Sequence, residues 1–338
     1  MRDPLRHHGD VEVRDGLLDF AVNVYDGPRP AWLDAALRGG LDAAGSYPSA
    51  TAAEGAVAAR HGRDPDEVLA TAGAAEAFSL IARLRRWERP VVVHPQFTEP
   101  HAALLQAGHD VTEVVLGDDF TLDPGVIPDD ADLVVVGNPT NPTGVLHPRP
   151  TLTDLLRPGR LVLVDEAFMD AVPGEPETLA ADRHPGLVVT RSLTKHWGIP
   201  GVRAGYLLGD PAVVAALRRE QVPWSVSSTA AAAMLACCTE EAVSESRRRA
   251  EEIAEWRRHL EESLSTMGIR HIASHASFVL ADVGDGVHDA LRVAGIAVRR
   301  ADTFPGLGPS WVRIAVRPPA RTRSLLDALS EARSDALG

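Results

Sequence analysis

Lysine is almost absent from this 338-residue chain. Lysine and arginine together number 34, and Lys195 is the single lysine among them. Arginine can replace lysine on most of a protein surface at little cost, but a guanidinium cannot become the neutral amine that condenses with an aldehyde. The position at which the one lysine is kept is therefore a candidate for amine chemistry.

Cysteines and long apolar runs are also scarce. The two cysteines, Cys237 and Cys238, are neighbours and poorly placed for an unstrained disulfide, so we expect both to be reduced and to face the core. The sequence has no run of about 18 apolar residues, which argues against a membrane-spanning helix. Its first residues are polar, without the apolar segment of a signal peptide, and we expect a cytoplasmic protein.

Positive charge is in deficit. The formal net charge is −13, which argues against a nucleic-acid or anionic-membrane partner. No G-x-G-x-x-G motif follows an early strand, which excludes a nicotinamide-dependent Rossmann enzyme. We expect a small-molecule substrate and predict no metal site.

Short apolar runs alternate with helical patterns through the middle of the chain. Most of these runs are rich in β-branched residues, continuously apolar, and bounded by Gly, Pro or Asp. Such strands are buried on both faces, which predicts an α/β fold with a mainly parallel central sheet covered by helices. The predicted strands lie within residues 67–72, 89–95, 110–117, 132–139, 160–168, 186–192 and 202–209.

The pattern changes after about residue 211. Residues 211–265 are predicted to be helical, and they include a long charged helix whose charges we expect to be solvated. A small α/β region follows. We predict an N-terminal segment over residues 1–35 that packs near the active site and the small domain, a large domain over 36–225, and a connecting helix with a small C-terminal domain over 226–338.

Two of the predicted strands are followed by segments that could bind a ligand. Gly73-Ala74-Ala75-Glu76 opens a helix, where a glycine lets backbone N–H groups approach an anion. An ordinary strand-to-helix turn is the plainer interpretation. The loop NPTNPTG, residues 138–144, contains two Asn-Pro steps and can present Asn141 at a fixed place.

Two further strands end in an acid and in the lone amine. Asp165 ends an apolar run, where a carboxylate is costly unless a positive group meets it. Ser192 ends the next run, Lys195 follows three residues later, and Arg203 eight residues beyond that. Parallel strands bring their carboxyl ends to one edge of a sheet, so we expect all these groups to lie together.

This set of groups suits a phosphorylated heteroaromatic aldehyde. The amine binds the aldehyde, the acid keeps the ring nitrogen protonated, and the helix N-terminus, serine and arginine hold the phosphate. The inferred cofactor is pyridoxal 5′-phosphate (PLP).

The motifs NPTNPTG, VDEAF and SLTK…GVRAGY, in this order and at these spacings, resemble fold-type I PLP enzymes of the class I/II aminotransferase superfamily. The resemblance runs from about residue 7 to the end of the chain. It implies that Lys195 is the Schiff-base lysine, that Asp165 pairs with the pyridine nitrogen, and that Asn141 donates to the ring oxygen. It also implies that the cofactor phosphate is bound by Gly73, Ala74, Ser192 and Arg203.

Three more positions match the family in shorter motifs. Phe97 would stack on the cofactor ring, and Arg313 would grip the substrate α-carboxylate. Tyr47 would reach the phosphate across the interface of a homodimer with shared active sites. Plainer interpretations remain: a core residue for Phe97, an exposed rung of a strand for Arg313, and an ordinary loop aromatic for Tyr47.

Motifs outside the centre resemble one subfamily in particular. HHGD near the start, DEAFMD, and GIAVRRADTFPGLGPSWVRIAVR are similar to threonine-phosphate decarboxylases of cobalamin biosynthesis and, next, to histidinol-phosphate aminotransferases. The resemblance places Arg299 near the substrate phosphate and carboxylate, and His7 near the phosphate. The alternatives are an exposed strand end for Arg299 and a solvated tail for His7.

The activity that this resemblance implies is decarboxylation of L-threonine O-3-phosphate. Transamination of the histidinol-phosphate aminotransferase kind is the first alternative, and a PLP-fold protein that binds a ligand without turnover is the second.

The sequence departs from the family pattern at several positions. Phe168 replaces a tyrosine that bonds the ring oxygen in many relatives, so Asn141 would act there alone. Ala74 and Ala75 leave only backbone N–H groups in the phosphate turn. Residues 23–28, NVYDGP, and Ser277 differ from the usual pattern at positions that border the substrate.

Overall fold

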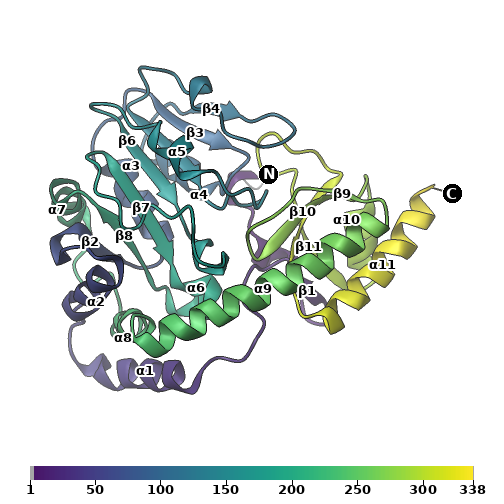
Figure 1. Ribbon diagram of the computed structural model, residues 1–338, viewed down its shortest axis with the longest axis horizontal. Helices are drawn as coiled ribbons and strands as arrows, with labels where there is room; N and C mark the ends of the chain where they lie inside the picture. The colour runs from purple at the N-terminus through teal and green to yellow at the C-terminus, as the bar shows by residue number, and fades with distance from the viewer. Residues whose placement is uncertain (1–3, 338) are drawn as a thin grey trace.

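Two sheets organise the chain, and the long helix α9 (Glu240–Thr266) lies beside both (Figure 1). The computed structural model describes residues 4–337, and the side chains of residues 4–333. The sheets differ in size and in strand direction.

The larger sheet has seven strands in the order β2-β8-β7-β6-β5-β3-β4. Neighbouring strands are parallel except at β8, which is antiparallel to both β2 and β7. The predicted mainly parallel sheet is therefore confirmed. The strands are β2 (Val68–Thr71), β3 (Pro90–His94), β4 (Thr112–Val115), β5 (Leu133–Gly137), β6 (Leu161–Asp165), β7 (Leu187–Ser192) and β8 (Gly205–Gly209).

Helices cover both faces of this sheet. Along β5, Val134 and Val136 join one apolar core, while Leu133 and Val135 join the other. This burial on both faces explains why the strands are apolar without alternation. Helices α1 (Ala31–Asp42), α2 (Thr51–His61), α5 (Arg149–Thr153) and α8 (Ser228–Cys237) contribute to the first core, and α3 (Ala74–Arg83), α4 (Glu99–Gln106) and α7 (Pro211–Glu220) to the second.

The smaller sheet joins the two ends of the chain. Its order is β1-β11-β12-β10-β9, and β1 (Leu18–Phe20) pairs in parallel with β11 (Ile296–Arg300). Helix α9 and the last two helices pack on it and share its apolar core. The remaining elements are β9 (Arg270–His271), β10 (Phe278–Asp282), β12 (Trp311–Ala315), α10 (Val287–Val293) and α11 (Pro319–Leu337). The N-terminal segment thereby lies against residues almost 300 positions away.

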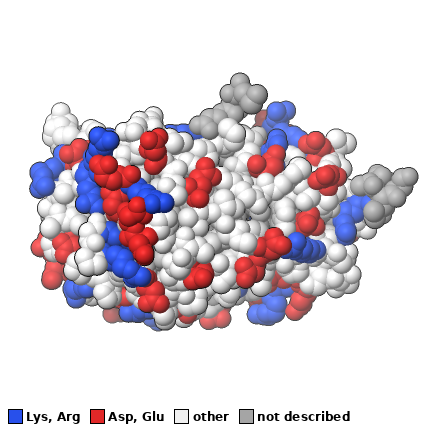
Figure 2. Space-filling model, turned by 90° about the horizontal axis from the view of Figure 1, so that it is seen from above, with Lys and Arg blue, Asp and Glu red and all other residues white. Residues whose placement is uncertain are grey.

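Short helices complete the chain. They are α6 (Leu193–His196) and the 3-10 turns η1 (Pro4–Arg6), η2 (Gly9–Glu12), η3 (Ala43–Gly45), η4 (Pro65–Glu67), η5 (Pro124–Val126), η6 (Met169–Ala171) and η7 (Pro200–Val202). Both cysteines are free, as predicted, and Cys237 is buried while Cys238 is only partly so. No helix within residues 4–337 is long and apolar enough to cross a membrane. On the face shown in Figure 2, acidic and basic side chains lie interspersed.

Candidate active site

A cavity of about 510 Å³ lies where the strand ends of the large sheet meet the N-terminal segment and the small sheet. Most of the predicted site residues line it: Ala74, Phe97, Asn141, Asp165, Ser192, Lys195, Arg203, Arg299 and Arg313. Gly73, His7 and Tyr47 are not among the residues that line it. The strand ends thus bring together groups that are up to 239 positions apart in the chain.

Burial moves the pKa values of Asp165 and Lys195 toward each other. Asp165 accepts hydrogen bonds from Thr190 Oγ1 at 2.9 Å and from the Ala167 N–H at 3.2 Å. Desolvation nevertheless raises the pKa of its carboxyl to about 6. Desolvation, assisted by the charges of Arg313 and Arg203, lowers the pKa of the Lys195 amine to about 8. The buried acid is therefore suited to a cationic partner, and a useful fraction of the amine is neutral near pH 7 to 8.

A tight turn after β2 faces the guanidinium of Arg203. Gly73 has a φ of +76°, and a Cβ added to it would lie 2.4 Å from Arg203 Nη2. Arg203 is itself held in the left-handed region, with a φ of 58°, and its Nη1 donates to the Pro200 carbonyl at 3.0 Å. Only a glycine leaves this space open.

Hydroxyl groups border the same space. Ser192 Oγ and Thr194 Oγ1 share a hydrogen bond of 2.8 Å, and both residues line the cavity. The backbone at the start of α3, two hydroxyls and a guanidinium therefore converge, which is an arrangement suited to a phosphate group.

Arg313 is a buried cation held by neutral groups. Its Nη1 donates to Asn141 Oδ1 at 2.6 Å, and its Nη2 donates to the Ala21 carbonyl at 2.7 Å. With the Asn23 amide turned so that its oxygen faces the guanidinium, Asn23 accepts from Nη1 at 3.0 Å and from Nε at 3.1 Å. Burial lowers the pKa of Arg313. Arg313 is not an exposed rung of its strand, and it forms no ion pair with a carboxylate in the described part of the chain.

Arg299 is a second buried guanidinium in the cavity. Its Nη2 donates to the His7 carbonyl at 2.6 Å and to Thr303 Oγ1 at 2.6 Å, and its Nη1 donates to the Arg300 carbonyl. Burial lowers its pKa to about 10. Within residues 4–333 it also has no carboxylate in an ion pair, so both guanidinium groups remain available to an anionic ligand.

Of the two N-terminal histidines, the sequence predicted a site role for His7 only. The His7 ring lies 2.7 Å from Glu12 Oε1, and only the backbone of His7 contacts Arg299. His8 lines the cavity instead, with its Nε2 2.6 Å from Glu99 Oε1. The structure therefore places His8, and not the His7 ring predicted for the substrate phosphate, beside the cavity.

Phe97 lies half-buried at the cavity wall. Its ring centroid is 5.5 Å from that of His8 and 6.2 Å from that of Phe78. It is packed on two sides, yet it contributes to the lining, so its ring can meet a flat ligand.

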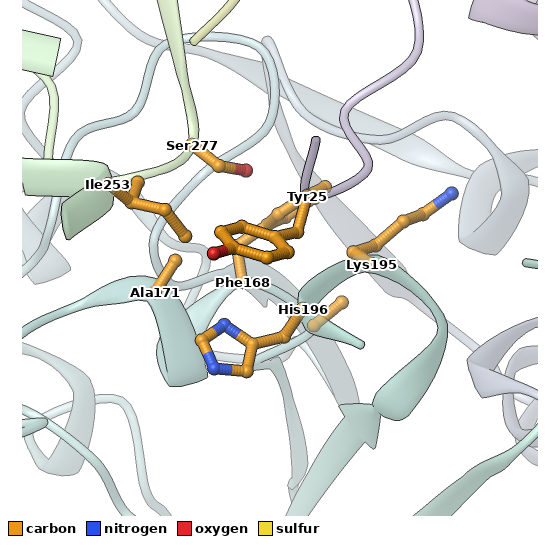
Figure 3. A pocket seen from close by; sticks show the side chains of 8 residues that line it. Tyr25, Phe168, Ala171, Lys195, His196, Ile253 and Ser277 are labelled. Carbon is orange, nitrogen blue, oxygen red and sulfur yellow. The ribbon is translucent and has the colours of Figure 1, made fainter. Parts of the chain in front are cut away.

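Three departures from the family pattern gather around a second, much smaller cavity of about 10 Å³ (Figure 3). Tyr25, Phe168 and Ser277 line it, while the Lys195 amine points away from the Tyr25 ring. The Tyr25 hydroxyl donates to Glu252 of α9. Phe168 packs edge-on against Phe278, with the two ring centroids 4.9 Å apart. A phenyl group cannot donate a hydrogen bond, so the site lacks the usual tyrosine hydroxyl at position 168.

Tyr47 lies outside the cavity of its own chain. It is 79% exposed and stacks on Trp224, which is 61% exposed, with ring centroids 4.4 Å apart. Two exposed aromatic rings in contact form an apolar patch on the surface.

Several lining residues were not singled out from the sequence. Gly9, Asp10, Thr194 and Phe304 all line the cavity, and so does Asn23, the first residue of the segment expected to border the substrate. A Cβ on Gly9 would lie 2.5 Å from the Ala21 carbonyl, so this glycine permits the N-terminal segment to approach Arg313 closely. The glycine in HHGD was the one available signal for this contact.

The residues of the large cavity fit PLP. A turn that a Cβ would fill faces Arg203, Asp165 at the end of β6 forms no ion pair with another described residue, and Lys195, the only lysine of the chain, lies between Asp165 and Arg203 in the sequence. Asn141 Oδ1 is occupied by Arg313, which leaves the N–H groups of this amide as its donors.

Comparison with known proteins agrees with this fit. The model of the family "Aminotransferase class I and II" matches residues 15–331. The chain is 47% identical to a protein of Mycobacterium tuberculosis named histidinol-phosphate aminotransferase, over 93% of this chain and 87% of that one. It is 32% identical to the threonine-phosphate decarboxylase of Salmonella typhimurium, over 93% of this chain and 91% of that one.

Solved structures show the same fold. The histidinol-phosphate aminotransferase of Clostridium acetobutylicum has a TM-score of 0.87 at 24% identity, over 94% of this chain and all of that one. That of Sinorhizobium meliloti, solved in complex with PLP, has a TM-score of 0.84 at 22% identity, over 93% and 90% of the two chains. The chain therefore belongs to the class I and II aminotransferase family, and it is a PLP-dependent enzyme with the fold of that family.

Proposed function

We propose that this enzyme transfers the amino group of a phosphorylated amine to a 2-oxo acid, with histidinol phosphate as the first donor to test. One observation supports it most: the buried guanidinium groups of Arg299 and Arg313 line the same cavity as Lys195, and neither forms an ion pair with a carboxylate in the described part of the chain. A donor with a phosphate and an acceptor with carboxylates would together engage both guanidinium groups. The 47% identity to a histidinol-phosphate aminotransferase supports transamination above the decarboxylation expected from the motifs.

The cofactor would be held at the strand ends. Arg203, Ser192 and the backbone N–H groups after Gly73 would bind its phosphate, and Asn141 would donate to its ring oxygen. Asp165 would keep the proton on the ring nitrogen, because a buried carboxylate is stabilised by an adjacent cation. When bound, PLP supplies an electron-accepting ring that weakens the bonds to the substrate Cα.

Side chains of the protein would carry out the proton transfer and orient the substrates. Lys195 would hold the cofactor covalently and, once released by the substrate amine, would take the proton from Cα as a neutral base. Its lowered pKa of about 8 supports this role. Arg313 would orient the carboxylate of the 2-oxo acid, and Arg299 would bind the phosphate of the amine donor at the side of the N-terminal segment.

Decarboxylation of threonine phosphate is the second candidate. That substrate has a carboxylate and a phosphate in one molecule, so Arg313 and Arg299 could bind it simultaneously. A threonine-phosphate decarboxylase at 32% identity supports this candidate more weakly.

A homodimer is part of the proposal. The exposed pair Tyr47 and Trp224 would be covered by a second copy, and Tyr47 would then reach the phosphate site of that copy.

A substrate panel with product mass spectrometry tests the proposal. Holoenzyme is incubated with histidinol phosphate and 2-oxoglutarate, or with O-phosphothreonine alone, and Lys195→Ala is the control. Transamination gives glutamate and a carbonyl product without CO₂. Release of CO₂ from O-phosphothreonine, with no glutamate from the first mixture, would instead support the decarboxylase.

A further inference from the structure

Three side chains that are typical metal ligands meet at the β3-β4 edge of the large sheet, outside the lining of the candidate active site. His94 ends β3, His101 lies in α4, and Glu113 lies in β4. One potential ligand atom from each lies within 4.8 Å of the others. In the parallel pairing of β3 and β4, Val92 is opposite Glu113, so Glu113 and His94 lie on the same face of the sheet. This is the face that α4 covers, which is why the three elements converge.

The spacing of the two imidazoles suits a common ion. His94 Nε2 and His101 Nδ1 are 3.1 Å apart. Two nitrogens that bind one tetrahedral Zn²⁺ at ordinary bond lengths are about 3.3 Å apart. A shift of a few tenths of an ångström would therefore convert this pair into two ligands of one ion.

The hydrogen bonds of the protein do not satisfy the His94 ring. His94 is fully buried, and its Nδ1 has no hydrogen-bond partner among the described residues. The nitrogen that would bind the ion is Nε2, which already faces His101 Nδ1, so the unpaired Nδ1 is not itself part of the coordination. Glu113, in contrast, is exposed, so its carboxylate can turn toward the histidines.

A groove provides access to the cluster. It has a volume of about 500 Å³ and is lined by His101 and Glu113, with Leu105 and the carboxylates Asp110 and Asp302 at its sides. An ion could enter through it, and water could occupy the coordination position that faces it.

We propose that His94, His101 and Glu113 form a binding site for a divalent transition-metal ion, and that Zn²⁺ is the ion their two imidazoles and one carboxylate favour. The site is separate from the PLP cavity, and its role is structural. The ion links β3, β4 and α4 at the base of the segment that follows His94, which contains Phe97 and Glu99 of the cavity wall.

Metal titration tests this site. Holoenzyme without a histidine tag is treated with a chelator, dialysed, and titrated with Zn²⁺ by calorimetry, and with Co²⁺ by absorbance. We expect one ion per chain and a rise in the thermal unfolding midpoint at saturating Zn²⁺. Glu113→Gln should weaken binding at least about tenfold, and His101→Gln should weaken it further.

Two exposed carboxylates, Glu113 and Asp118, provide a test variant and its control. Glu113 is exposed, so Glu113→Gln should fold normally even if a histidine variant does not. Asp118→Asn, in the exposed loop just after β4, removes one negative charge away from the cluster and should leave the affinity unchanged. The proposal is overturned if the chelated holoenzyme binds no stoichiometric ion, or if Glu113→Gln and Asp118→Asn bind it as tightly as the parent.

Discussion

Asn141 Oδ1 accepts a hydrogen bond of 2.6 Å from Arg313 Nη1, and this contact joins the two sheets across the cavity. Asn141 follows β5 of the large sheet, and Arg313 lies in β12 of the small sheet. The residue proposed to contact the cofactor ring therefore also positions the guanidinium proposed to bind the substrate carboxylate.

Replacing Asn141 should consequently affect substrate binding as well as the cofactor. Asn141→Ala removes a hydrogen bond to a charged group, and such bonds contribute about 1.5 to 3 kcal/mol. We expect the KM for the 2-oxo acid to rise roughly tenfold or more, together with a change in the cofactor absorbance. Steady-state kinetics measure this, and an unchanged KM would mean that Arg313 does not depend on Asn141.

Asp165 should destabilise the cofactor-free protein as the pH rises. Its pKa increases from 3.8 to about 6 on folding, so the folded chain retains a proton that the unfolded chain has lost. Stability is thus lost between about pH 4 and pH 6, by up to about 3 kcal/mol, and the loss stays constant above that range. Asp165→Asn should be more stable than the parent at pH 8 but similar at pH 4, and nearly inactive. Urea unfolding at both pH values checks this, and equal stabilities at pH 8 would contradict it.

Gly73→Ala should weaken cofactor binding by displacing Arg203. The new Cβ would lie 2.4 Å from Arg203 Nη2, and a flexible guanidinium can move away only by leaving the phosphate space. Gly62→Ala is a matched control, because Gly62 also has a positive φ, of +63°, but has open space around its Cβ position. Gly62→Ala should lose about 1 kcal/mol of stability, and Gly73→Ala should lose more, because the ψ of 167° at Gly73 belongs to a region that almost only glycine adopts. Only Gly73→Ala should bind PLP more weakly, by roughly tenfold or more, and equal affinities in a fluorescence titration would exclude the role given to Arg203.

The Tyr47 and Trp224 patch should hold two copies together. Trp224→Asp replaces an indole ring that is 61% exposed in the single chain by a negatively charged carboxylate. We expect the dimer dissociation constant to rise at least about tenfold in sedimentation measurements. Val293→Asp, at an apolar position that is 91% exposed on α10, is the control and should have no effect. A parent chain that stays monomeric at micromolar concentration would contradict the shared-site proposal.

The sequence predicted the part of the site that follows strands. Asn141, Asp165, Ser192 and Lys195 each come just after, or at the end of, an apolar run, and parallel pairing brings such positions to one edge. The mainly parallel sheet followed from the same runs.

Contacts between distant segments could not be predicted in this way. His8 and Asn23 reach the cavity because β1 pairs with β11, a pairing that no local pattern indicates. Arg249 also differs from expectation. It lies in the charged helix expected to be solvated, yet it is fully buried and donates to the His196 and Pro28 carbonyls. Such partners depend on the fold and not on spacing.

The most direct test of the central claim is a half-reaction in which PLP-loaded enzyme meets histidinol phosphate without any 2-oxo acid. We predict that the cofactor absorbance changes to that of its aminated form without release of CO₂, and that 2-oxoglutarate restores it. Lys195→Ala, which removes the only lysine of the chain, should show no such cycle. An unchanged spectrum with histidinol phosphate, together with CO₂ release from O-phosphothreonine, would contradict transamination.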